Sequence, residues 1–218
     1  DVDSSKAVAA LGRVLSRQEA WLDLAALYRD RADVVSDPED AKMWLERLAT
    51  LYEEVIADLD ETIEVYRRMH DLDPDDPAIQ RTLERLYGHA HRWHDLADLY
   101  RRRIEQTLEP ELAMDLRFRL AALLEGELDM VDDALQIYRD ILESEPGHYE
   151  TLRALEGLRR DLAAREGDWV QYRLQIVDLL LEHYNEQQHW RRIVDLLDEK
   201  EELLGDISGQ VDALSEMA

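Results

Sequence analysis

The residues best placed to do chemistry are three histidines that lie close together in the sequence. His89, His91 and His94 form a His-x-His-x-x-His pattern at a predicted turn between two helices. Two imidazoles at this spacing could bind one zinc or nickel ion. The equivalent positions of the internal repeat described below carry no histidine, so the cluster is not part of the repeated unit. We therefore favour surface histidines in a turn, and we expect no metal and no cofactor.

Other catalytic patterns are absent from the sequence. It contains no Cys, no Gly-rich phosphate loop, no G-x-S-x-G and no His-Glu-x-x-His. The acidic segments 71–76 and 129–133 lack the Gly and the final Glu of a calcium loop. Capping of helix N-termini explains these carboxylates better. The chain is therefore not expected to be an enzyme.

The charge of the chain restricts its partners. Among 218 residues, 51 are acidic and 26 are basic, which gives a formal net charge of −25. A protein of this charge is not expected to bind nucleic acid, which requires a basic face, or to insert into an anionic membrane. We favour a solvated outer surface as the reason for the charge. The alternative is attraction of a basic partner or mimicry of nucleic acid.

The most informative feature of the sequence is a repeat of 72 residues. Trp21 recurs as Trp93, and the same spacing separates three further pairs, which are Pro38 and Pro110, Tyr66 and Tyr138, and Pro74 and Pro146. The segment that follows Trp21 also recurs after Trp93, in the pattern Trp-x-Asp-Leu-Ala-x-Leu-Tyr-Arg. A fixed period in a sequence of helical composition is typical of a solenoid, in which each repeat packs against its neighbours.

Apolar residues at three- and four-residue spacing predict an all-α protein without a β-sheet. Short connections predict antiparallel neighbours. Eleven helices are expected, at 3–16, 18–35, 38–57, 59–72, 76–90, 92–107, 110–126, 130–143, 147–164, 167–185 and 189–204. Pro38 and Pro110 are expected in first turns of helices, whereas Pro74 and Pro146 follow helix ends.

These helices predict a single solenoid over residues 1–204. It contains four-helix copies at about 5–76 and 77–148, and a partial, divergent copy at 149–204. The third copy is shifted by four residues, since the next Trp falls at 169 and not at 165. Residues 205–218 are expected to form a C-terminal tail or cap.

Half of the helix pairs resemble tetratricopeptide repeats. The segments 62–69 and 134–142 each lead to an acidic turn with Pro, as the second helix of such a repeat does. The helices before them carry Leu48-Ala49 and Leu120-Ala121, similar to the first-helix pattern of that family. The alternate pairs match less well, because a Trp opens their second helix. The resemblance implies a right-handed α-α superhelix whose inner groove, lined by first helices, binds peptides or proteins.

The resemblance also places particular charges in that groove. Basic side chains expected there are Lys6, Arg13, Arg17, Arg81, Arg85, His89 and Arg153, and acidic ones are Glu46, Glu53, Asp115 and Glu125. Of the basic group, all but Lys6 are our candidates for binding a partner. A groove of alternating charge could bind a charged peptide through Arg–carboxylate pairs. The alternative is that these arginines form exposed pairs within their own helices.

The sequence leaves two functions open. The first is a non-catalytic scaffold that binds a protein or peptide, and the second is a structural module that stacks into homo-oligomers. A metal-binding accessory domain using the histidine turn is a third alternative. The strong preference for Arg over Lys is typical of GC-rich bacterial genomes, and the missing initiator Met indicates a piece of a longer protein. The cellular compartment stays open, with the cytoplasm as the expectation.

Overall fold

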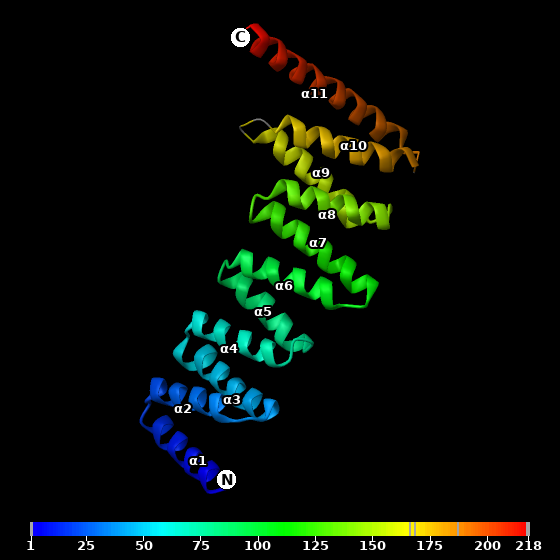
Figure 1. The fold of residues 1–218 in the computed structure, drawn as a ribbon. Helices are drawn as coiled ribbons and strands as arrows, with labels where there is room; N and C mark the ends of the chain where they lie inside the picture. The colour runs from blue at the N-terminus through cyan, green and yellow to red at the C-terminus, as the bar shows by residue number, and fades with distance from the viewer. Residues whose placement is uncertain (1, 166, 168, 187, 217–218) are drawn as a thin grey trace. The chain divides into compact units, whose positions relative to one another are not determined.

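The computed structural model describes the chain except residues 1, 166, 168, 187 and 217–218, and the side chains of 2–6, 186 and 206–216 are also outside the description. Every regular element in the described part is helical (Figure 1). The contacts divide the chain into two compact units, Asp1–Leu96 and Ala97–Ala218, which we describe separately. The extent of a single solenoid over 1–204 therefore stays a prediction.

The first unit is a series of helices that pack in chain order. Its elements are α1 (Val2–Arg17), α2 (Trp21–Val34), α3 (Pro38–Leu51), the π-helical turn η1 (Tyr52–Ile56), α4 (Leu59–Leu72), α5 (Pro77–His89) and the first residues of α6 (Trp93–Gln106). Each helix from α1 to α4 contacts the next one, and η1 contacts α2, α3 and α4. This sequential packing is the arrangement expected of a helical repeat protein.

The second unit continues the same pattern. Besides most of α6 it contains α7 (Pro110–Gly126), α8 (Val131–Ser144), α9 (Tyr149–Ala164), α10 (Val170–Glu186) and α11 (Trp190–Glu216). Here α7 contacts both α8 and α9, and α10 contacts α8, α9 and α11. Contacts between a helix and the second helix along the chain let successive pairs share one apolar core. The predicted all-α helical repeat architecture, similar to tetratricopeptide repeats, is confirmed.

The backbone repeats at the same 72-residue period as the sequence. Glu19 and His91 have φ values of 55° and 54°, and Ala57 and Asp129 have φ values of 58° and 52°. These left-handed residues end helices, because an L-residue in this conformation cannot continue a right-handed helix. The bond from the Ala20 N–H to the Leu15 carbonyl, 3.0 Å long, closes the first of these helix ends. Helix ends are thus placed equivalently in successive copies.

Four tryptophans lie at or just before the start of a helix, each two residues after a position with positive φ. Trp21, Trp93 and Trp190 are the first residues of their helices, and Trp169 directly precedes α10. Two residues before each Trp, the backbone has positive φ, at Glu19, His91, Gly167 and Gln188. At three of these ends, the residue after the one with positive φ donates its N–H to the carbonyl five residues before it, as in a Schellman motif.

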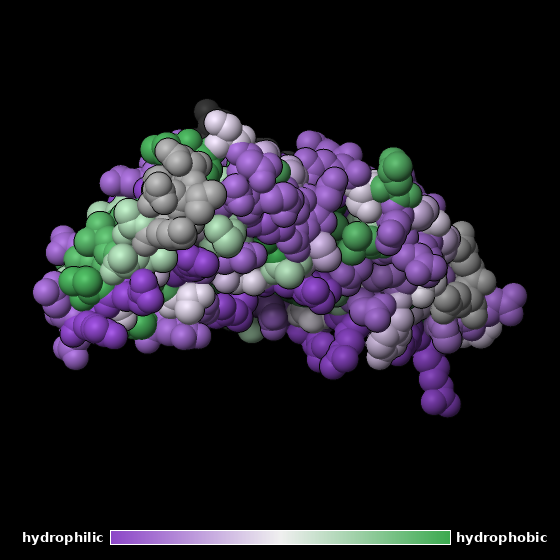
Figure 2. Space-filling model, turned by 90° about the horizontal axis from the view of Figure 1, so that it is seen from below, coloured by the Kyte–Doolittle hydropathy of each residue, from purple (hydrophilic) through white to green (hydrophobic). Residues whose placement is uncertain are grey.

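The cores of both units contain the predicted apolar faces. Leu48 and Ala49 are at most 1% exposed, as is Ala121. Tyr138 is fully buried, whereas Tyr66 at the equivalent position is only half-buried. Hydrophilic residues cover most of the surface visible in Figure 2, and apolar residues appear there as separate areas. No helix in the described part is both long enough and apolar enough to span a membrane.

Several predicted helix boundaries were wrong. The helices predicted at 18–35 and 167–185 begin at Trp21 and Val170, because Glu19 and Gly167 have positive φ. The helix predicted over 38–57 becomes the π-helical turn η1 after Leu51. The last helix was predicted to end at 204 but continues to Glu216. Gly205 and Gly209 lie inside this helix, where a Gly costs only about 1 kcal/mol relative to Ala.

Candidate functional site

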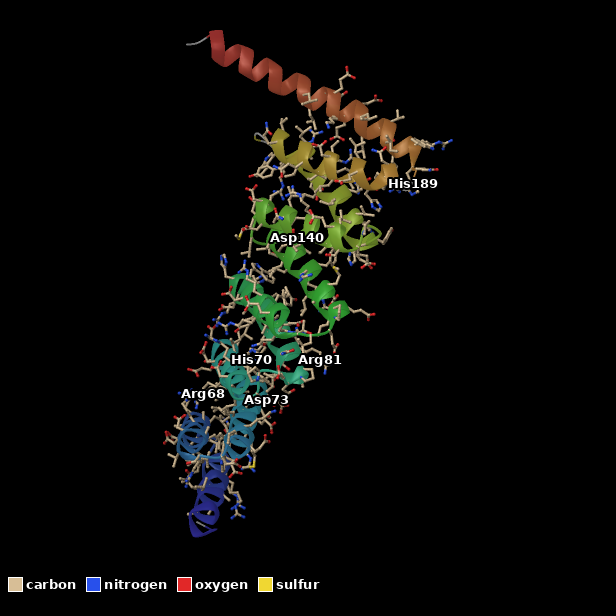
Figure 3. The ribbon with its side chains drawn as sticks, turned by 45° about the vertical axis from the view of Figure 1, so that its right-hand side comes forward. Arg68, His70, Asp73, Arg81, Asp140 and His189 are labelled. Carbon is tan, nitrogen blue, oxygen red and sulfur yellow. The ribbon has the colours of Figure 1, made fainter. Side chains whose placement is uncertain are left out.

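The six predicted partner-binding residues are all exposed and lie on three helices. Arg13 and Arg17 belong to α1, Arg153 belongs to α9, and the remaining three, Arg81, Arg85 and His89, belong to α5. Successive members on α5 are four residues apart, so they share one face of that helix. The structure therefore brings the α5 residues together (Figure 3 labels Arg81). Arg153 lies in the other unit, and α1 has no recorded contact with α5 within the described part.

Two of the arginines are held by their own helices. The Arg13 Nε donates to the Ala9 carbonyl at 3.2 Å, and the Arg81 Nε donates to the Pro77 carbonyl at 3.0 Å. These bonds fix the start of each guanidinium group but leave its outer N–H donors in solvent. Both side chains therefore present unused donors at the surface, as a peptide-binding residue would.

Arg85 and His89 line a cleft of about 210 Å³ in the first unit. The opposite wall comes from η1 and the start of α4, and it includes Tyr52, Glu53 and Asp58. The Arg85 Nη2 donates to the Glu53 Oε1 at 2.6 Å across the cleft. This pair is exposed, with 58% of the Arg85 side chain and 37% of the Glu53 side chain accessible. Solvent screening limits such a pair to about 1 kcal/mol, so its groups remain available to a partner.

The cleft owes its shape to the local backbone. The π-helical turn at 52–56 widens the end of the α3 helix, and Ala57 in the left-handed conformation then reverses the chain. Asp58 caps α4 by accepting the Glu61 N–H at 3.1 Å. A π-helical turn inside an otherwise regular helix is often found at a functional site. Tyr66 lies close by, and burial, reinforced by the charge of Glu53 and opposed by Arg85, raises the pKa of its phenol.

A second group of residues occupies the same repeat positions 72 residues later. Glu125 replaces Glu53, Tyr138 replaces Tyr66, Gly157 replaces Arg85 and Asp161 replaces His89. The Tyr138 Oη donates to the Glu125 Oε2 at 2.8 Å. Burial raises the pKa of Glu125, the charge of Asp161 raises it further, and the Tyr138 bond and Arg165 oppose the shift. We call these two groups the Glu53 site and the Glu125 site.

Glu53 and Glu125 were both predicted as groove acids, but their partners were not predicted. The Glu53–Arg85 pair joins residues 32 positions apart, which periodicity within one helix does not connect. The signal that could have found it is the repeat itself, because aligning the copies pairs Arg85 with Gly157. This alignment shows that the second copy has no basic residue at the position of Arg85.

The structure also shows an ionic cluster that the sequence analysis missed. The Lys42 Nζ donates to the Asp76 Oδ2 at 2.6 Å and to the Asp73 Oδ2 at 2.9 Å. The Asp76 hydrogen bond, followed by that of Asp73, raises the pKa of Lys42, and Lys42 lowers the pKa of Asp76. Asp76 also caps α5 by accepting from the Ala78 N–H at 2.8 Å. The cluster therefore ties α3 to the turn before α5 and has a structural role.

The histidine turn contains no metal-like arrangement. His91 packs edge-on against Trp93, with ring centroids 5.2 Å apart. Across the described residues, no group of three or more His, Asp or Glu side chains is arranged to hold a metal ion. His89 instead faces the cleft beside Arg85.

Comparison with known proteins finds similarity in structure only. No family model and no curated protein matches the sequence. Among solved structures, BtubC (BKLC) from P. vanneervenii is 16% identical, with 94% of this chain and 81% of that chain covered and a TM-score of 0.35. MamA (AMB-1) is 15% identical, with 93% of both chains covered and a TM-score of 0.37. A putative kinesin light chain from Podosopora anserina, with nearly identical TPR-like repeats, is 14% identical, with 93% and 95% covered and a TM-score of 0.35.

The chain is thus similar to helical repeat proteins of the tetratricopeptide type. These TM-scores are too low to support a function, and the helical repeat architecture follows from the helices of this chain and their contacts.

Proposed function

We propose that the protein is a non-catalytic scaffold that binds a protein or peptide partner through the face of α5 and the adjoining cleft. The observation that carries the proposal is the Glu53 site, where Arg81, Arg85 and His89 share one exposed helix face beside a cleft of about 210 Å³. A peptide carboxylate could take the free donors of Arg81, and a peptide cation could compete for Glu53.

Charge and exposure support binding over catalysis at this site. The Glu53–Arg85 pair is exposed to solvent. The polar groups around it line an open cleft and not an enclosed cavity. A catalytic site usually excludes water and holds groups with strongly shifted pKa values. An open groove of mixed charge instead favours recognition of an extended chain by paired charges.

The test combines capture with site-specific crosslinking. A photo-crosslinking amino acid replaces Thr82, a half-buried neighbour of Arg81, and the protein is exposed to lysate of its source organism. We expect a crosslinked protein whose yield falls at least fivefold in the variant Arg81→Ala/Arg85→Ala/His89→Ala. The control Arg101→Ala/Arg102→Ala removes two exposed guanidinium groups from α6 and should leave the yield unchanged. Equal yields from all three proteins would contradict the proposal.

One further observation favours the alternative of self-assembly. The last helix, α11, exposes a row of large apolar side chains at Trp190, Val194, Leu197 and Leu204, which are 64%, 55%, 49% and 47% accessible. An exposed apolar face of this kind can pack against a second copy of the chain. Light scattering across a concentration series tests this alternative. A concentration-dependent dimer that Val194→Glu abolishes would support it, and a monomer at all concentrations would remove it.

A further inference from the structure

The Glu125 site contains a half-buried carboxylate that its own chain does not neutralise directly. Glu125 accepts one hydrogen bond, from Tyr138, and no ion pair of Glu125 is recorded within the described residues. The charge of Arg165 lowers its pKa, but that guanidinium is bound to Asp129, with its Nη1 2.7 Å from the Asp129 Oδ1. A carboxylate in this setting gains more from a cationic neighbour than one that is fully solvated.

The repeat shows what kind of group fits beside this carboxylate. At the equivalent place in the first unit, the Arg85 guanidinium binds Glu53 at 2.6 Å. The residue equivalent to Arg85 is Gly157, so the guanidinium and its entire side chain are missing from the Glu125 site. The first copy of the repeat thus contains a guanidinium–carboxylate pair, and the second copy contains only the carboxylate.

Space for such a group is present at Gly157. A Cβ added to Gly157 would meet no atom within 4 Å, so the position is open and not filled by another side chain. Asp161 lies one helical turn further along α9, on the same face, and acts electrostatically on Glu125. Helices α7 and α9, which carry Glu125 and Gly157, are in contact.

We propose that the Glu125 site binds the guanidinium group of an arginine from a protein partner. Glu125 accepts from the guanidinium as Glu53 does from Arg85, Tyr138 fixes the carboxylate from the other side, and Asp161 adds negative charge at the rim. The planar fork of Arg matches a carboxylate better than the point charge of Lys does. The inference rests on the proposed function only for the source of the arginine, because the site itself can be tested with a small molecule.

The test is an NMR titration of the full chain with Nα-acetylarginine methylamide, using signals of Tyr138 and of the α9 backbone near Gly157. We expect a saturable shift that is lost in Glu125→Gln and in Gly157→Arg, which supplies the guanidinium from within the chain. The citrulline analogue has nearly the same shape without the charge, and it should give at least a tenfold weaker response. The control Glu111→Gln removes an exposed carboxylate from the same helix and should keep the full response.

Two results would overturn the proposal. One is an equal response to the citrulline analogue, and the other is a response that survives in Glu125→Gln, because either shows that the Glu125 charge does not bind the probe. Circular dichroism of each variant confirms that the helices are retained. The crosslinking experiment at Thr82 is independent, so failure there with success here would separate the proposed partner surface from the arginine site.

Discussion

Glu53 and Glu125 occupy the same position of the 72-residue repeat, yet their charges are balanced differently. Glu53 is 37% accessible and pairs with Arg85, whereas Glu125 is more buried and relies on the hydroxyl of Tyr138. The tyrosines differ in the same sense, since Tyr138 is fully buried and Tyr66 is not. The change from Arg to Gly thus leaves the second carboxylate without the guanidinium that pairs with the first one. The local backbone differs as well, because Glu53 lies in the π-helical turn η1 and Glu125 lies in the regular helix α7.

The largest expected effect concerns the buried cores beside the two sites, at equivalent positions of the repeat. Leu83 and Leu155 are 72 residues apart, on α5 and α9, and are 1% and 0% exposed. Leu83→Ala and Leu155→Ala should each lower the free energy of unfolding by about 2–5 kcal/mol, because each leaves a cavity in a packed core. Urea unfolding followed by circular dichroism measures both. A loss below about 1 kcal/mol in only one variant would mean that the two helices are packed differently. The Glu53 and Glu125 sites could then not be compared position by position.

A smaller effect is expected when an arginine is introduced at position 157. Gly157→Arg should raise the free energy of unfolding by about 1–2 kcal/mol, of which roughly 1 kcal/mol is helix propensity and up to about 1 kcal/mol is the new ion pair. The control Gly157→Ala isolates the propensity contribution. In a double-mutant cycle with Glu125→Gln, the ion-pair contribution should vanish. Equal stability of the Arg and Ala variants would show that position 157 does not face Glu125.

The helix ends beside the two sites provide a finer test. Ala57 and Asp129 are both left-handed, so Ala57→Gly should stabilise the protein by roughly 0.5–1 kcal/mol by relieving the Cβ contact. Asp129→Gly should gain less, because it also removes the partner of Arg165. Thermal unfolding of the two variants compares them directly. A larger gain for Asp129→Gly would indicate that its pair with Arg165 contributes nothing.

The smallest effect concerns pH. Since burial raises the pKa of Glu125 above its unfolded value, its contribution to stability is fully present below the unfolded pKa and is lost as pH rises through the folded pKa. Glu125→Gln cannot titrate, so the stability of the variant relative to the native protein should increase as pH rises through that range. Urea unfolding from pH 4 to pH 8 measures this difference. A difference that does not change with pH would contradict a raised pKa.

Much of the fold could be predicted because helical periodicity is local. Pro38 and Pro110 begin helices as predicted, and the Leu-Ala pairs at 48 and 120 are buried. The end of α11 was missed because the cost of Gly inside a helix is small. The left-handed conformations of Glu19 and Ala57 were also missed, because neither is a residue type that favours that conformation.

The candidate site was predicted less completely. The resemblance predicted Arg85, His89 and Glu53 as groove residues, but it could not show that Arg85 and Glu53 meet across a cleft. Nor could it show that Arg81 would be held by its own helix. Such contacts depend on how helices pack, and charge alone does not determine this. An alignment of the repeats can predict such contacts in one copy only when the structure of another copy is known.

The most direct test of the central claim is the pKa of Glu125, measured by carboxyl-carbon NMR in the native protein and in Gly157→Arg. We predict that the pKa of Glu125 is raised above its ordinary value in the native protein, because burial and Asp161 disfavour its charge. A lower pKa is predicted in the variant, where the new guanidinium neutralises the carboxylate as Arg85 does for Glu53. The same pKa in both proteins would show that position 157 does not face Glu125, and it would contradict the proposed arginine site.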